Sequence, residues 1–247
     1  MEVTAVFIHG MWGTSKGLGP LAERISKVTE VKSIDLDRSN PEKLRFQDFI
    51  NQVERFINNI SGKVILIGHS MGGLLAQTVG TPRKGSHVSE DKIAGRILLA
   101  PAAPRGILQV RNWEQIRSII TQLPQRFKPT NKPSPEVAER LIFNQHKALG
   151  IEWDPNSFQD LPTLVFHDVF CGVYAPRREK TEILVGEDDL ITPPSIQNKT
   201  AAYHKTTLRK FPGHDHMSIL KDNTVGAHVE LLVRTFMNGK PSQSEAV

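Results

Sequence analysis

The sequence predicts an α/β fold in which a mostly parallel sheet of about six strands has helices on both faces. Short apolar runs alternate with stretches of helical length along most of the chain, a pattern typical of right-handed β–α–β units. The run KVILI at Lys63–Ile67 is almost entirely apolar, as expected for a central strand covered on both faces. The 247 residues are enough to bury the core of one such domain.

Each expected element follows from the spacing of apolar residues. Strands are predicted at Val3–Ile8, Val31–Leu36, Lys63–Ile67, Ile97–Ala100, Thr181–Val185 and Thr207–Phe211. Apolar residues that recur every three or four positions predict amphipathic helices. Such helices are expected at Pro20–Val28, at Phe46–Ile60, from the turn Gly68–Gly73 to about Gly80, and at Thr224–Met237, with a polar loop at 81–95.

The alternation of strands and helices breaks between residues 104 and 175. This stretch has helical patterns at Val110–Leu123 and Pro135–Leu149 but no clear strand of the sheet. We therefore expect residues 104–175 to form a helical cap over the carboxyl ends of the strands, where open α/β sheets bind ligands. Residues 1–103 and 176–240 then form the core, and 241–247 a disordered tail.

The composition argues against several classes of protein. The net charge is +5, but the basic residues are scattered, so no nucleic-acid partner is expected. No apolar run approaches the roughly 20 residues that span a bilayer, so no membrane partner is expected. The single cysteine, Cys171, and a start without the basic and apolar regions of a signal peptide predict a cytoplasmic protein.

The clearest motif is Gly68-His69-Ser70-Met71-Gly72, which lies between an apolar strand and a helix. A sharp strand-to-helix turn lifts a serine hydroxyl clear of a sheet and requires very small residues two positions away on either side. The two glycines meet that requirement. Ser70 is therefore the candidate nucleophile.

A serine hydroxyl is a poor nucleophile until a base removes its proton and an acid orients that base. In this kind of fold the chain order is serine, acid, histidine. The strand after Ser70 ends in APAAP and holds no carboxylate, whereas the last two strands end in GEDD and GHDH. The candidate acids are Asp188 and Asp189, and the candidate bases are His214 and His216.

Together these motifs, with His9-Gly10 after the first strand and GEDDLITP late in the chain, resemble the α/β-hydrolase superfamily. The resemblance covers most of residues 3–236 and is weakest over 104–175. The chain looks like compact members such as plant methyl-ester esterases and hydroxynitrile lyases. It implies a serine hydrolase with Ser70 as nucleophile. The family spacing favours Asp189 over Asp188 as the acid and His216 over His214 as the base.

The family position also implies an oxyanion hole formed by the backbone N–H groups of Met71 and Met11. His9, Trp12 and Trp113 are candidates for the substrate pocket. No HExxH pattern or Walker sequence occurs, so we expect no metal and no cofactor.

The expected substrate is a small carboxylic ester, with a lactone or thioester as close variants. An anionic substrate is an open alternative, because residues 104–150 hold more basic than acidic side chains. The basic ones are Arg105, Arg111, Arg117, Arg126, Lys128, Lys132, Arg140 and Lys147. Two other functions stay open: a lyase or carbon–carbon hydrolase with the same residues, and a ligand receptor with negligible turnover. A monomer and a homodimer are equally compatible with the sequence.

Overall fold

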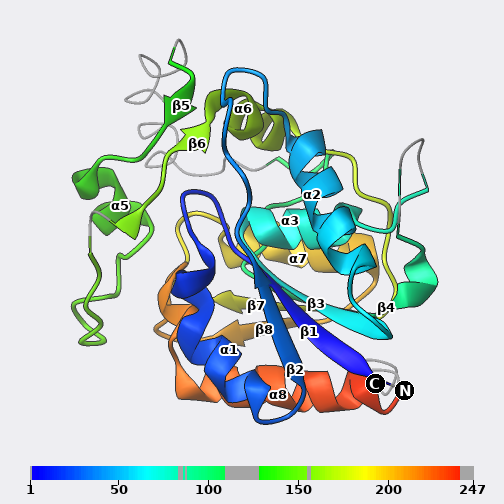
Figure 1. Cartoon of the computed structure of the whole chain (residues 1–247). Coiled ribbons are helices and arrows are strands. Elements are labelled where there is room, and N and C mark those ends of the chain that lie inside the picture. The colour runs from blue at the N-terminus through cyan, green and yellow to red at the C-terminus, as the bar shows by residue number, and fades with distance from the viewer. Residues whose placement is uncertain (1, 83–85, 87, 109–127, 155–156, 240–247) are drawn as a thin grey trace.

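A sheet of six parallel strands forms the centre of the molecule in the computed structural model, which describes residues 2–82, 86, 88–108, 128–154 and 157–239 (Figure 1). The strands are β1 (Val3–Ile8), β2 (Glu30–Ile34), β3 (Lys63–His69), β4 (Ile93–Leu99), β7 (Thr181–Gly186) and β8 (Leu208–Phe211). Their order is β2-β1-β3-β4-β7-β8, and every neighbouring pair is parallel. The predicted six-stranded α/β sheet is confirmed.

Both faces of the sheet are covered by helices. Along β1, Ala5 and Phe7 pack toward one face, while Val6 and Ile8 pack toward the other, because successive side chains of a strand alternate. The first face is covered by α1 (Gly19–Ser26) and α8 (Asn223–Met237), and the second by α2 (Phe46–Asn58), α3 (Met71–Thr78) and α7 (Pro194–His204) (Figure 1). This three-layer arrangement explains why all residues of β1 and β4 are buried.

Several predicted boundaries were wrong. Ile93–Gly95 belongs to β4 and not to the polar loop that was expected at 81–95. The helix expected at Pro135–Leu149 ends at Leu141, as α5 (Pro135–Leu141). Two helices were not predicted: α6 (Thr163–Cys171), rich in β-branched and aromatic residues, and α7, which has little apolar periodicity.

Residues between β4 and β7 extend beyond the sheet on the side of its carboxyl ends (Figure 1). Their described part contains α5, α6 and a small antiparallel sheet of β5 (Thr130–Asn131) and β6 (Leu161–Pro162). The helix expected at Val110–Leu123 lies outside the described residues. That 104–175 forms a separate cap with these boundaries stays a prediction.

The parallel strands bring distant parts of the sequence to one edge. His9 directly follows β1, Ser70 directly follows β3, and Asp189 and His216 lie shortly after β7 and β8. Because the carboxyl ends of parallel strands meet at the same edge, these side chains converge there.

The far end of α3 is held by two buried arginines. Arg96 donates from Nε to the carbonyl oxygen of Ala76 (2.8 Å), and Arg178 donates from Nε to that of Gln77 (2.9 Å). Glu90 accepts hydrogen bonds from both guanidinium groups, at 2.6 and 2.7 Å from Arg96 and 2.8 Å from Arg178. Cationic donors at a helix C-terminus satisfy its free carbonyls and match the helix dipole. They fix the helix that begins at the Ser70 turn.

We expect Arg178→Met to lower the free energy of unfolding by about 1–3 kcal/mol, because it leaves the buried carbonyls of Gln77 and Thr78 without this donor, whereas Glu90 keeps its bonds from Arg96. Arg177→Met is the matched control, since the neighbouring Arg177 is exposed. Urea unfolding of the two variants and the wild type measures the difference. Equal stabilities of both variants would show that this cluster does not support α3.

Candidate active site

Ser70 occupies a strained turn between β3 and α3. Its backbone angles are φ 54° and ψ −119°, a region that residues with a Cβ atom rarely adopt. A Cβ atom on Gly68 would lie 2.3 Å from the carbonyl oxygen of Gly72, and one on Gly72 would lie 2.1 Å from that of Ile8. Glycine is therefore required at both positions. The turn holds Ser70 at the wall of a pocket.

Asp189 and His216 form a buried pair beside this turn. The Nδ1 atom of His216 donates to Oδ2 of Asp189 at 2.8 Å. Asp189 also accepts bonds from the N–H groups of Ile191 and Thr192, each at 2.8 Å, and its Oδ2 lies 2.9 Å from the Thr192 hydroxyl. With Nδ1 protonated, a neutral imidazole has its lone pair on Nε2. His216 and Ser70 line the same pocket.

The surroundings of Asp189 favour its ionised form. Burial alone raises the pKa of the carboxyl group. The charge of His216 and the hydrogen bonds from His216 and Thr192 outweigh burial, so the pKa of Asp189 lies below its usual value. Asp189 can therefore orient an imidazole and stabilise it when it is protonated.

The alternative acid and base lie in other environments. The backbone of Asp188 donates to the carbonyl oxygen of His214 (3.0 Å) and accepts from Nδ2 of Asn144 (3.0 Å). The His214 ring has Nδ1 at 3.3 Å from the Ser218 hydroxyl and Nε2 at 3.6 Å from Asp222 Oδ2. The structure thus joins Asp189 to His216 and gives Asp188 and His214 other contacts.

Two further histidines near Ser70 are held neutral. His69 is buried and lies close to His216, which lowers its pKa to about 3. Its Nε2 donates to the carbonyl oxygen of His216 (2.9 Å). Burial lowers the pKa of His9 to about 4. His9 donates from Nδ1 to the Gly10 oxygen (2.8 Å) and accepts at Nε2 from the Leu36 N–H (3.3 Å). Both rings act as fixed hydrogen-bonding groups for the backbone around Ser70.

The N–H groups of Met11 and Met71, which were predicted as oxyanion donors, have no acceptor among the described residues. Met71 is the first residue of α3, so its N–H has no acceptor within the helix. The Gly10 oxygen accepts from His9 and from the Gly13 N–H (3.3 Å), and in a trans peptide the Met11 N–H points the opposite way. Within the described part of the chain, neither N–H group donates a hydrogen bond.

The pocket in front of Ser70 is mostly apolar and holds about 1150 Å³ of empty space, including its open mouth. Its walls come from the loops after the strands and from α5 and α6. The larger apolar side chains are Met11, Trp12, Leu18, Val137, Leu141, Ile142, Phe158, Phe166, Val169, Phe170, Ile191, Met217 and Leu220. His9 and Trp12, two candidates for the substrate pocket, line this pocket, whereas Trp113 lies outside the described residues. Among the lining residues that the structure describes, none is Asp, Glu, Lys or Arg.

Sequence reasoning missed Asp215, which organises the loop that carries His216. Its side chain is fully buried and accepts from the backbone N–H groups of Met217 (3.0 Å), Ser218 (2.7 Å) and Gln145 (2.7 Å). Asp before a turn is a common acceptor of backbone N–H groups, and this was the available signal. The bond from Gln145 joins residues 70 positions apart and has no sequence signal.

Comparison with known proteins identifies the family. The model of the "Alpha/beta hydrolase family" matches residues 5–226. The chain belongs to this family. A Haemophilus influenzae protein named "Putative esterase/lipase" is 37% identical over 79 residues, which are 30% of this chain and only 28% of that protein.

Solved structures show the same fold. Tomato methylketone synthase I superimposes with a TM-score of 0.67 at 16% identity, over 96% of this alpha/beta hydrolase and 99% of the tomato chain. A monoacylglycerol lipase from Paleococcus ferrophilus superimposes with a TM-score of 0.65 at 21% identity, over 96% and 95% of the two chains. Within the described residues of this hydrolase, no helix is long and apolar enough to cross a membrane, and no three His, Cys, Asp or Glu side chains converge as a metal site.

The neutral state of His69 predicts acid sensitivity of the fold. Unfolded His69 binds a proton below its ordinary pKa of 6.5, whereas folded His69 does so only near pH 3. Stability is therefore lost as pH falls from about 6.5, by at most about 1.4 kcal/mol per pH unit for this residue. We expect urea unfolding between pH 4.5 and 6 to depend less steeply on pH in His69→Gln. His167→Gln, at an exposed histidine, should keep the wild-type slope; equal slopes in all three proteins would refute the assignment.

Proposed function

We propose that this alpha/beta hydrolase is a serine hydrolase that cleaves carboxylic esters through an acyl-enzyme on Ser70. The observation that carries the proposal is the 2.8 Å hydrogen bond between His216 Nδ1 and Asp189 Oδ2 beside a strained serine on a pocket wall. A nucleophile, a base and an orienting acid in that arrangement are suited to acyl transfer. Lactones and thioesters react by the same steps.

In the proposed reaction, Ser70 Oγ forms a bond to the carbonyl carbon while its proton moves to Nε2 of His216. The carbonyl oxygen gains the electron pair of its π bond, and the N–H groups of Met11 and Met71 stabilise the resulting oxyanion. The oxyanion then returns its electron pair to re-form the C=O bond, the ester C–O bond breaks, and the alcohol leaves with the proton from His216. Water then attacks the acyl-enzyme while His216 accepts its proton. The bond between the acyl carbon and Ser70 Oγ breaks as His216 gives that proton to Oγ, which releases the acid.

A fluorophosphonate tests the nucleophile. We expect one covalent adduct on the wild type, mapped by peptide mass analysis to Ser70 and absent in Ser70→Ala. No adduct on folded wild-type protein would exclude an activated serine. That outcome would favour a ligand receptor, or a lyase that uses the same residues.

Paired substitutions test the acid and the base. Asp189→Asn removes the carboxylate that orients His216, so kcat for an activated ester should fall by about 1,000-fold or more. Asp188→Asn keeps the backbone bonds of Asp188 and should change kcat by less than about threefold. For the base, His216→Gln should likewise lose most of the activity, whereas its control His214→Gln should keep it. The assignment is wrong if the control of either pair loses as much activity.

The uncharged lining of the described pocket favours a neutral substrate over the anionic alternative. None of the described basic residues expected to attract an anion lines the pocket: Arg105, Lys128, Lys132, Arg140 and Lys147. Moving a carboxylate from water into an apolar site without a partner is costly. Arg111, Arg117 and Arg126 lie outside the described residues. We therefore propose a neutral ester with an apolar acyl group.

Two esters of equal chain length test this preference. We expect kcat/KM for p-nitrophenyl pentanoate to exceed that for mono-p-nitrophenyl glutarate by at least about tenfold, with little dependence on salt for the neutral ester. The measurement is kcat/KM for both esters at low and at moderate ionic strength. Faster turnover of the glutarate that declines with added salt would instead support the anionic substrate.

A further inference from the structure

The turn that carries the Met11 N–H is backbone-strained. Residues Gly10–Gly13 close a turn through the bond from the Gly13 N–H to the Gly10 oxygen (3.3 Å). Its third residue, Trp12, has φ +55°, where turns usually place glycine or asparagine. A tryptophan stays in this conformation only where its surroundings hold it there. The contacts of Trp12 and Gly13 therefore determine the backbone conformation of this turn.

Those contacts come from the segment between β4 and β7. The Trp12 oxygen accepts from the Gln159 N–H at 2.7 Å. The Trp12 indole N–H lies 3.1 Å from Oδ1 and 3.2 Å from the backbone oxygen of Asn131, and both act as acceptors. Asn131 pairs with Leu161 in the small β5–β6 sheet, so both contacts arise from one structural unit.

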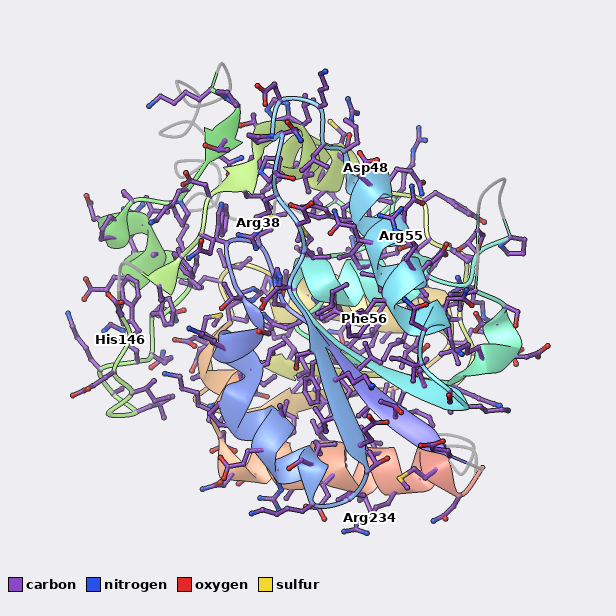
Figure 2. All side chains as sticks on the ribbon, in the orientation of Figure 1. Arg38, Asp48, Arg55, Phe56, His146 and Arg234 are labelled. Atoms are coloured by element: carbon purple, nitrogen blue, oxygen red, sulfur yellow. The ribbon has the colours of Figure 1, made fainter. Side chains whose placement is uncertain are left out.

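Arg38 adds a second connection between the same two parts. It lies between β2 and α2, and its guanidinium donates from Nη2 to the Gly13 oxygen (2.6 Å) and from Nη1 to the Asp160 oxygen (3.1 Å). The rigid fork of a guanidinium can bridge two carbonyls in a fixed geometry. In the view of Figure 2, Arg38 lies between α2 and the segment that carries α5, whereas Arg55 projects from α2.

We propose that Arg38 and Trp12 are positioning residues for the oxyanion hole. By fastening the Gly10–Gly13 turn to Gln159, Asp160 and Asn131, they keep the Met11 N–H directed toward the reacting carbonyl. The Met11 N–H belongs to the Gly10–Met11 peptide, whose oxygen accepts the bond from the Gly13 N–H. Without the bonds to Trp12 and Gly13, the turn is free to open as Trp12 returns to a negative φ, and the Gly10–Met11 peptide loses the bond from Gly13 that orients it. The turn then no longer holds the donor in one orientation. The inference rests on the proposed acyl transfer at Ser70.

A pair of ligands separates an oxyanion-hole defect from damage to the pocket. A trifluoromethyl ketone with an apolar chain accepts Ser70 Oγ at its carbonyl carbon, the serine proton moves to His216, and the carbonyl oxygen becomes an oxyanion. The corresponding secondary alcohol fits the same pocket but has no carbonyl to attack. Only the ketone adduct needs the Met11 N–H.

The main test compares Arg38→Met with Arg55→Met, an exposed arginine on α2. Loss of a whole oxyanion donor typically costs about 100- to 1,000-fold in kcat, and a loosened one should cost less. We expect kcat of Arg38→Met to fall by about 10- to 100-fold with KM changed by less than about threefold. Ketone affinity should fall by a similar factor while alcohol affinity is kept. Arg38→Lys, which retains the charge and a donor, should recover part of the loss, and Arg55→Met should match the wild type.

Trp12→Phe provides a second variant that changes no charge and keeps an aromatic ring against Phe158 and Phe166. It removes the indole N–H that binds Asn131, together with part of the ring volume. The same selective loss of ketone affinity is expected, smaller than in Arg38→Met. This variant decides the question if Arg38→Met does not fold.

Two results would overturn the inference while leaving the proposed function intact. One is an Arg38→Met enzyme with wild-type kcat and ketone affinity. The other is an equal loss of ketone and alcohol affinity, which would place Arg38 and Trp12 in pocket packing alone. A wild-type protein that neither turns over esters nor forms the ketone adduct would overturn the proposed function and this inference together.

Discussion

The close approach of the Ser70 turn to the end of β1 is the constraint on which the rest of the site depends. A methyl group on Gly72 would overlap the Ile8 carbonyl, and one on Gly68 would overlap the backbone of Gly72. With no side chains between them, β1 and the turn pack backbone to backbone, which brings the Gly10–Gly13 turn beside Ser70. The strain at Ser70 is maintained by this close packing of the turn against β1, as is common for strained residues at functional sites.

The electrostatics of the site follow from its burial. His9 and His69 are kept neutral by desolvation and serve as hydrogen-bonding groups for the backbone. The buried carboxylates, Asp189 and Asp215, each accept several N–H bonds that compensate for lost hydration. In such a desolvated site, charge that develops on a reacting oxygen interacts strongly with the backbone donors around it.

The segment between β4 and β7 contacts three of the loops that carry the proposed catalytic groups. It binds the turn after β1 through Asn131 and Gln159. It binds the loop after β7 through Asn144 and the loop after β8 through the N–H of Gln145. The segment therefore does more than cover the pocket. Its hydrogen bonds also hold the loops that carry the proposed acid, the proposed base and the Met11 N–H.

The sequence by itself determined the parallel sheet, most of its helices and the Ser70 turn, because apolar periodicity and the two glycines are local signals. It reduced the candidate acids to Asp188 and Asp189 and the candidate bases to His214 and His216. The family spacing favoured Asp189 and His216. Only the tertiary structure joined Asp189 to His216, 27 residues away, and Arg38 to Asp160, 122 residues away. Tertiary packing also determines that α6 and α7 are helices, because their local sequence does not predict a clear helix. Such contacts depend on where separate loops meet after the sheet has formed, and no short-range pattern encodes that geometry.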